Sequence, residues 1–169
     1  MNLTQAIACI EESISDPKRG LPFEVFKLIS RLTPMVNVDL LVTDKKNRVL
    51  LAWRDDIFAG EGWHIPGGIV RFKENLNNRI RQVAISEIGT DVEFSADPIA
   101  INQVICSHDT RGHFISLLFK CHIDTDFIPN NKDLSAKDPG YLFWHDHCPE
   151  NLVQVHEMYR QYISSSTIY

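Results

Sequence analysis

The chain has 169 residues, enough for one domain of average size and too few for two independent hydrophobic cores. Hydrophobic residues make up 44% of the sequence and charged residues 23%, as in globular proteins and unlike disordered or collagen-like chains. Because 22 acidic residues outnumber 17 lysines and arginines, the net charge is -5, and neither nucleic acid nor an anionic membrane is expected as a partner. A phosphate-bearing ligand would have to be held by a local group of positive residues or backbone amides, since the overall charge does not attract it.

The sequence indicates a cytoplasmic protein. Glu11, Glu12 and Asp16 interrupt the apolar residues near the N-terminus, so no export signal is recognisable there. No apolar run reaches the roughly 18 residues of a membrane-spanning helix. The cysteines are widely separated and form no CxxC pair, which argues against a disulfide framework or a zinc ribbon. They are Cys9, Cys106, Cys121 and Cys148.

Residues 1–32 predict a helical extension that precedes a single domain over residues 33–169. Within 4–15, apolar residues recur at helical spacing, and a second short helix is expected after Pro22. From Met35 the apolar period changes to two, which is typical of strands.

Two hairpins and a short strand are expected in the rest of the domain. The predicted strands cover residues 36–42, 48–54, 99–107, 113–123 and 141–144. Residues 124–140 are polar and predict a long loop. A last helix is expected to begin at Pro149, with Leu152, Tyr159 and Ile163 facing inward.

The stretch from Trp63 to Gly89 predicts a strand, a Pro-Gly-Gly turn and a helix with an acid near its end. Glu87 follows Ile80 and Val83 at helical spacing, so it shares their apolar face at the negative end of the helix dipole. Burial of its charge and the negative end of the dipole both disfavour the ionised carboxylate, and a bound cation would offset these two costs. Carboxylate, carbonyl and water oxygens are the ligands that Mg²⁺ or Mn²⁺ accepts. The alternatives are that Glu87 faces solvent or pairs with a nearby arginine, and that the two glycines form an ordinary turn.

The same stretch resembles the box of the Nudix hydrolases, which reads Gly, five residues, Glu, seven residues, then Arg-Glu-aliphatic-any-Glu-Glu-any-Gly-aliphatic. The matching residues are Gly68, Glu74, Ala84, Glu87 and Gly89. The departures are Gln82, Val83, Ser86 and Thr90, of which Val83 and Ser86 replace two of the acids. The resemblance implies an α+β fold of the α/β/α sandwich type, with a mixed β-sheet flanked by helices.

Loss of these two acids makes the chain most similar to the GDP-mannose mannosyl hydrolase branch of the Nudix family. The segment 33–39 resembles the first strand of that branch, and Val155-His156 with Arg160 and Tyr162 resembles its last helix. The resemblance extends from about Thr33 to Ile163.

This resemblance implies a set of site residues. Gly67 would supply a carbonyl ligand and Glu87 a carboxylate ligand to Mg²⁺, with Mn²⁺ as the substitute. Arg54 would contact the leaving diphosphate and Asp39 the sugar or nucleotide. Two further arginines of the branch fall on Ile69 and Gln82, and the nearby Arg71 and Arg79 are the substitutes for them.

The general base is left open between two residues. The branch has a metal-binding Gln and a catalytic His in the loop before the last strand, where this chain has Lys137-Asp138-Pro139, so Asp138 is the candidate for a metal ligand or base. His108 is the second candidate, because it follows a predicted strand at a hairpin and histidine titrates near neutrality. A solvated turn histidine is the alternative reading of His108.

The resemblance therefore predicts a Mg²⁺-dependent hydrolase acting on a nucleoside diphosphate linked to another group, a nucleotide sugar such as GDP-mannose. Attack would occur at the anomeric carbon if the chemistry follows the branch, and at phosphorus if it follows the broader family. A Nudix-fold module that binds a nucleotide sugar without turnover is the alternative from another class. The expected partner is a small molecule, and the oligomeric state is left open, a homodimer included.

Overall fold

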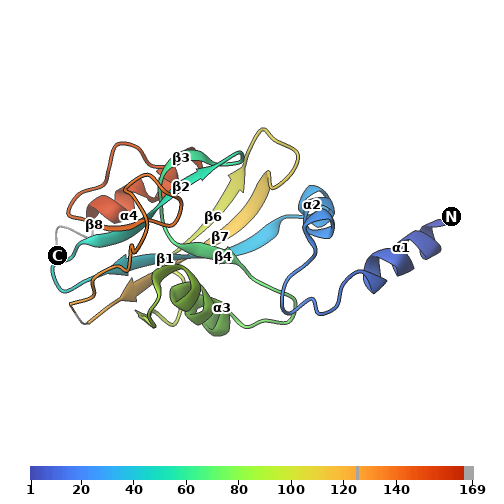
Figure 1. The fold of residues 1–169 in the computed structure, drawn as a ribbon, viewed down its shortest axis with the longest axis horizontal. Helices are drawn as coiled ribbons and strands as arrows, with labels where there is room; N and C mark the ends of the chain where they lie inside the picture. The colour runs from blue at the N-terminus through green and yellow to red at the C-terminus, as the bar shows by residue number, and fades with distance from the viewer. Residues whose placement is uncertain (125, 166–169) are drawn as a thin grey trace.

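The computed structural model describes residues 1–124 and 126–165. Within them, eight strands form one mixed sheet with the central order β3-β2-β1-β7-β5 (Figure 1); β4 pairs with β1, β6 with β7 and β8 with β2. The strands are β1 (Met35–Thr43), β2 (Val49–Asp56), β3 (Gly60–His64), β4 (Gly67–Ile69), β5 (Glu93–Phe94), β6 (Ala100–Ile105), β7 (His113–His122) and β8 (Leu142–His145). Strands β1 and β7 run parallel, and the other pairs are antiparallel.

Helical segments lie on both sides of the sheet, which confirms the predicted sandwich (Figure 1). They are α1 (Leu3–Glu12), α2 (Phe23–Leu32), α3 (Leu76–Val83), the π-helical turn η1 (Ala84–Ile88), the 3₁₀ helix η2 (Gln154–Tyr159) and α4 (Arg160–Ser165). Among the described residues, no helix has both the length and the apolar character needed to cross a membrane.

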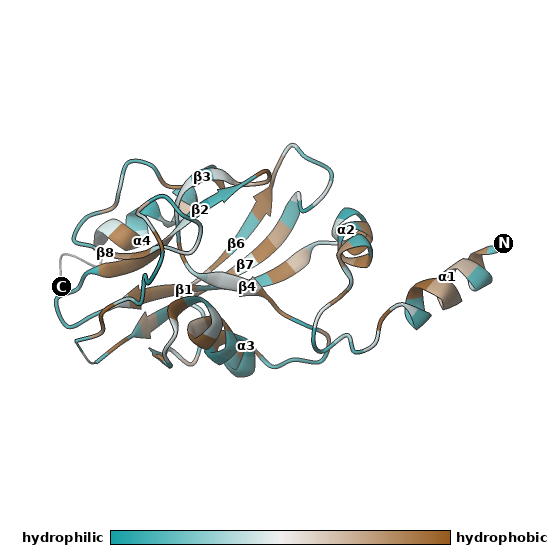
Figure 2. Cartoon of the chain, in the orientation of Figure 1, coloured by the Kyte–Doolittle hydropathy of each residue, from teal (hydrophilic) through white to brown (hydrophobic). Residues whose placement is uncertain are grey.

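Alternating side chains of the central strands build two separate cores, one on each face of the sheet. Leu40 and Leu50 pack with Ile80 of α3 on one face, whereas Leu41 and Leu51 belong to the core beneath η2 and α4 on the other. Apolar residues are correspondingly concentrated on the central strands (Figure 2). The period of two read from the sequence therefore determines which core each strand residue enters.

The N-terminal helices differ in how they relate to this body. α1 has no buried residue and extends away from the sheet (Figure 1). α2 buries Val25 and Ser30 and lies against the domain, on the side where the β6–β7 hairpin turns.

Two local predictions were wrong. Gly67 and Gly68 do not form a turn: they pair with Asp39 and Val38 as part of β4, because glycines can approach β1 and α3 closely where a side chain would collide. The last helix begins at Gln154, not at Pro149. The preceding segment is extended and pairs with β3, where the Trp63 amide donates to the Asn151 carbonyl at 2.9 Å.

The remaining elements lie close to their predicted positions. Both hairpins are present, and the helix ahead of Gly89 ends there, with Gly89 in the left-handed conformation at φ 88°. The predicted loop 124–140 contains no helix or strand among its described residues, and residue 125 lies outside them. Residues 166–169, at the end of the predicted domain, also lie outside the description.

Candidate active site

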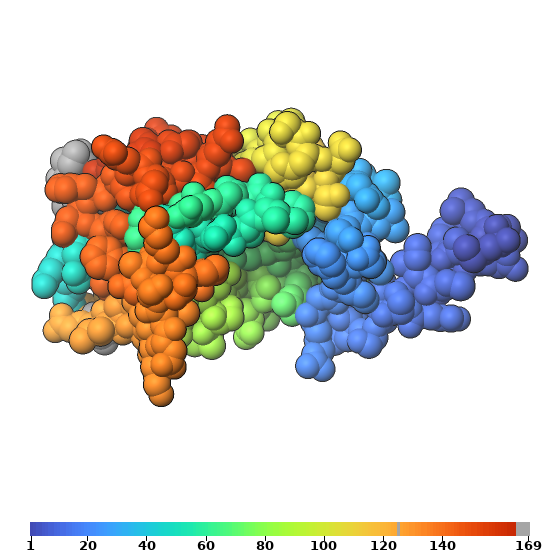
Figure 3. Space-filling model, turned by 45° about the horizontal axis from the view of Figure 1, so that its top comes forward, coloured from blue at the N-terminus to red at the C-terminus, as the bar shows by residue number. Residues whose placement is uncertain are grey.

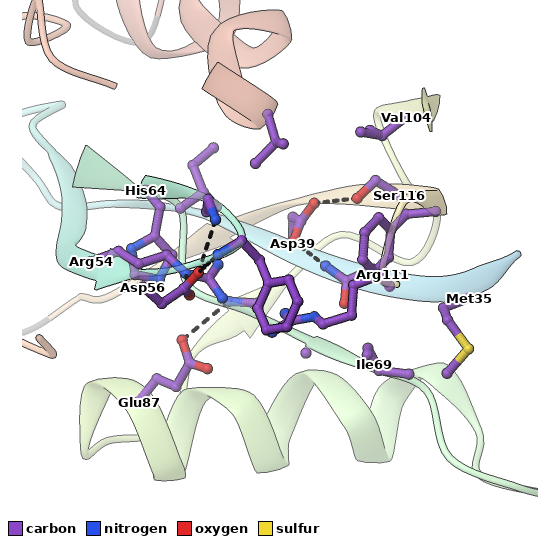
Figure 4. Close-up of a pocket in the computed structure, with 18 of the residues that line it drawn as sticks. Met35, Asp39, Arg54, Asp56, His64, Ile69, Glu87, Val104, Arg111 and Ser116 are labelled. Atoms are coloured by element: carbon purple, nitrogen blue, oxygen red, sulfur yellow. Dashed lines mark hydrogen bonds and ion pairs between the residues drawn. The ribbon is translucent and has the colours of Figure 1, made fainter. Parts of the chain in front are cut away.

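A large pocket, with a volume of about 850 Å³, is lined by residues of the α3–η1 segment as well as of η2. Its walls come from β1, β2, β4, α3 with η1, the β6–β7 hairpin, η2 and the N-terminal segment that leads into α2. Figure 4 shows labelled lining residues from several of these elements. The volume lies within the range of small-molecule sites, so the pocket is large enough for a nucleotide-sized ligand.

Glu87 lies at one side of this pocket, in the π-helical turn η1 that follows α3. Such single π turns recur at functional sites. Its Oε2 accepts a hydrogen bond of 3.2 Å from the backbone amide of Gly67 (Figure 4). The side chain reaches solvent through the pocket. Desolvation by the surrounding protein nevertheless raises the pKa of Glu87 to about 7. The hydrogen bond from Gly67 and the charge of Arg54 lower this pKa, whereas the charge of Asp39 raises it further.

Asp39 forms the floor of the pocket and is 1% exposed. Its Oδ2 accepts from the hydroxyls of Ser116 at 2.6 Å and Tyr159 at 2.5 Å, and its Oδ1 accepts from the Asn37 amide at 2.6 Å. Burial raises the pKa of Asp39, and the three hydrogen bonds counteract part of that rise. A buried carboxyl held by three donors has a fixed position.

Gly67 brings these two acids together. It is the register partner of Asp39 in the β1–β4 pair, and a Cβ added to it would collide with Asp39 Oδ1 and with the Val38 carbonyl. The peptide can therefore lie between Asp39 and Glu87 only because residue 67 is a glycine.

Four arginines line the pocket: Arg54, Arg71, Arg79 and Arg111. Arg54 Nε forms an ion pair of 2.5 Å with Asp56 Oδ2. Desolvation alone would raise the pKa of Asp56, but hydrogen bonds from Ala59, Arg54 and Phe58 lower it to about 2, so this carboxylate stays charged. The arginines supply the local positive charge that the overall composition lacks.

Two further histidines, to which no sequence pattern assigned a role, also line the pocket. His64 and His156 have ring centroids 6.0 Å apart, and His156 Nδ1 accepts from the Ile65 amide at 3.0 Å. Burial lowers the pKa of each to about 3, so both are neutral near pH 7. Ser116 and Tyr159 were also missed; Tyr159 was read only as a core residue, and no local pattern links either residue to Asp39.

The predicted site residues are largely brought together. Asp39, Arg54, Gly67, Arg71, Glu87 and His108 all line the one pocket. Asp138 is not among the lining residues, although its neighbours Pro139 and Gly140 are. Its carboxylate accepts hydrogen bonds from the Ser135 amide at 2.7 Å and hydroxyl at 2.8 Å, and the role predicted for it stays a prediction.

The oxygen ligands beside Gly67 fit a hard divalent cation that takes few of its ligands from the protein. Among the described residues, no three His, Cys, Asp or Glu side chains are grouped so as to hold a metal by themselves. Glu87 nevertheless offers a partly desolvated carboxylate that makes no ion pair with any described residue. Mg²⁺ commonly binds through one or two carboxylates, substrate phosphates and water, and Glu87 would supply the carboxylate of such a set.

Comparison with known proteins identifies the fold. No protein-family model matches the chain. The low-salt glycan biosynthesis protein Agl8 of Haloferax volcanii is 26% identical over 132 residues, which cover 74% of this chain and 84% of that protein.

Solved structures of Nudix proteins superimpose on most of this chain. A MutT NUDIX hydrolase from Burkholderia pseudomallei superimposes with a TM-score of 0.63 at 19% identity, covering 78% of this chain and 99% of that one. A MutT protein from Methanosarcina mazei Go1 gives a TM-score of 0.60 at 16% identity, with coverages of 81% and 98%. A NUDIX-family hydrolase from Clostridium perfringens gives 0.56 at 14% identity, with coverages of 78% and 97%. The chain therefore has the Nudix fold, as predicted.

Proposed function

We propose that the protein is a Mg²⁺- or Mn²⁺-dependent Nudix hydrolase that acts on a nucleoside diphosphate linked to another group, a nucleotide sugar such as GDP-mannose. The observation that supports this most is the pocket in which Glu87 and the Gly67 peptide lie with Arg54 in a Nudix fold. The likeness to a glycan biosynthesis protein supports a sugar as the linked group.

In the proposed complex, Glu87 and Gly67 hold the cation, which when bound supplies neutralisation of charge on the diphosphate. Arg54 contacts the diphosphate through its guanidinium, and Asp56 fixes the position of that group. Asp39 lies at the floor, where its buried carboxyl orients the sugar or nucleotide. Arg71 is a further candidate for phosphate contact from the loop after β4.

We rank His108 ahead of Asp138 as the group that activates water. His108 lines the pocket from the β6–β7 hairpin, whereas the Asp138 carboxylate is engaged by Ser135. A base has to come within hydrogen-bond reach of the water, or within reach through one further water. We keep attack at the anomeric carbon as the proposed chemistry, because Val83 and Ser86 occupy box positions that carry acids elsewhere in the family.

The test is hydrolysis of a panel of nucleoside diphosphate sugars with added Mg²⁺ in oxygen-18 water. The label should appear in the released sugar, and Glu87→Gln should reduce turnover by about a hundredfold or more, as expected when a group that stabilises the transition state is lost. Label in phosphate would refute the anomeric-carbon chemistry and favour cleavage at phosphorus.

A binding module without turnover is the second candidate. The observation in its favour is that Val83 and Ser86 stand where the Nudix box has acids, and that Lys137-Asp138-Pro139 contains no His where the resembled branch has its catalytic one. This candidate predicts binding of a nucleotide sugar with no product formed in the same assay, so one experiment separates the two functions.

A further inference from the structure

The β6–β7 hairpin, the loop between β2 and β3, and α2 meet at Arg111. Figure 3 shows α2 beside this hairpin on one face of the molecule. The Arg111 amide donates to Ser30 Oγ of α2 at 3.1 Å. Its guanidinium carbon lies 4.9 Å from the ring centroid of Phe58 and 5.9 Å from that of Phe26, so two aromatic rings from different segments hold the group.

This guanidinium is available for a ligand. Arg111 lines the pocket, and Figure 4 shows it entering from the side away from Glu87. Its Nε is buried without a hydrogen-bond partner, and it makes no ion pair with any described residue. Arg111 also has φ 57°, a left-handed conformation that residues other than glycine rarely adopt and that tends to be kept at functional positions.

The electrostatics indicate an anion as the missing partner. Burial lowers the pKa of Arg111, and the positive charge of Arg54 lowers it further, while Asp56 alone counteracts them. Asp56 is already paired with Arg54, so Arg111 has no carboxylate of its own among the described residues. A diphosphate between the two guanidinium groups would compensate the excess charge, and its oxygens match the planar fork of arginine.

We propose that Arg111 is a phosphate-binding residue of this pocket, which contacts the diphosphate of the ligand from the side opposite Arg54. This inference rests on the proposed function in that the ligand is a nucleoside diphosphate. It gives the N-terminal segment a role in the site, since Phe26 of α2 helps to fix the guanidinium.

The test uses the full chain and inorganic pyrophosphate with Mg²⁺ as the probe, measured by calorimetry. Arg111→Gln should weaken pyrophosphate binding by about tenfold or more, because a charge-assisted contact is lost. Arg111→Lys should give an intermediate loss, because it retains charge without the fork. Arg81→Gln is the matched control: Arg81 pairs with Asp91 outside the pocket and should bind as the wild type does.

A wild-type measurement keeps the inference testable if the Arg111 variants do not fold. In protein with ¹⁵N-labelled arginine, the Nε–H resonance of Arg111 should shift when pyrophosphate is added, while that of Arg81 stays in place. An unshifted Arg111 resonance, or unchanged pyrophosphate affinity in a folded Arg111→Gln, would overturn the inference and leave Arg111 as a packing residue.

Failure of the proposed function gives a different result. A wild type that hydrolyses no nucleotide sugar but binds pyrophosphate through Arg111 refutes the hydrolase and supports the phosphate contact. A wild type that hydrolyses the sugar nucleotide, with pyrophosphate affinity and KM unchanged in Arg111→Gln, supports the hydrolase and refutes the contact.

Discussion

The proposed cation site depends on the Glu87 carboxylate. Glu87→Gln removes one negative charge with little change in shape and should lower the affinity for Mn²⁺ by about tenfold or more in the presence of a nucleoside diphosphate. Calorimetry measures this, with Glu93→Gln as the control, because Glu93 is exposed on β5 away from the pocket. Equal Mn²⁺ affinity in Glu87→Gln and wild type would exclude Glu87 as a ligand.

The raised pKa of Glu87 also makes stability depend on pH. The pKa is about 7 in the folded protein against 4.5 for a free glutamate, so between these values the folded state binds more protons than the unfolded state. The stability that Glu87 contributes is therefore present below pH 4.5 and is lost as the pH rises through about 7.

Thermal unfolding without metal should show this dependence. The Tm of the wild type relative to Glu87→Gln is expected to fall across that window, and Mn²⁺ should restore it at the upper end. Asp39, whose pKa is also raised, is present in both proteins, so the comparison removes the part of its titration that does not depend on Glu87. A difference in Tm that does not change with pH would contradict the assigned shift.

The short strand β4 is the element on which the site depends most. In Gly67→Ala, the added Cβ would push against Asp39 and the backbone of β1, so we expect a loss of about 1–3 kcal/mol in stability, typical of overpacking, together with loss of pyrophosphate binding.

The control for this strand is Gly60→Ala. Its added Cβ meets nothing, although φ 75° makes the substitution strained. It should lower Tm while leaving pyrophosphate affinity unchanged. If both variants bind pyrophosphate normally, the close approach of β4 to Asp39 is not needed for the site.

Among the helices and strands, those with a clear apolar period could be predicted from the sequence. Alternating apolar residues located β1, β2, β6 and β7, and helical spacing located α3. β4 was missed because glycine has no side chain to show a period and is usually read as a turn. The extended segment before η2 was missed because its pairing partner, Trp63, is remote in the sequence.

The site residues can be compared in the same way. The resemblance to the Nudix box and its GDP-mannose mannosyl hydrolase branch predicted roles for Glu87, Gly67 and Arg54, and these three residues line one pocket. Arg111 lacks such a signal, since its contacts with Phe26 and Phe58 join segments that no local pattern connects. Tertiary contacts of this kind require the folded chain.

For the whole molecule, α1 is expected to be dispensable. It buries no residue, so deletion of residues 1–12 should leave the free energy of unfolding within about 0.5 kcal/mol of the full chain. Pyrophosphate affinity should also be unchanged, because every lining residue of the pocket remains. Denaturant unfolding and calorimetry measure both, and a larger loss would mean that α1 packs on the domain in solution.

The hydrogen bonds of Asp39 also constrain when the site can form. Its partners Ser116 and Tyr159 lie 77 and 120 residues further along the chain. Contacts over such separations form slowly, because loop closure must come first. During synthesis, the carboxyl of Asp39 therefore leaves the ribosome long before its last donor, and the pocket floor is completed only when η2 has emerged. A chain that stops before Tyr159 would keep both glycines and Glu87, yet its buried acid would lack the hydroxyl that holds it.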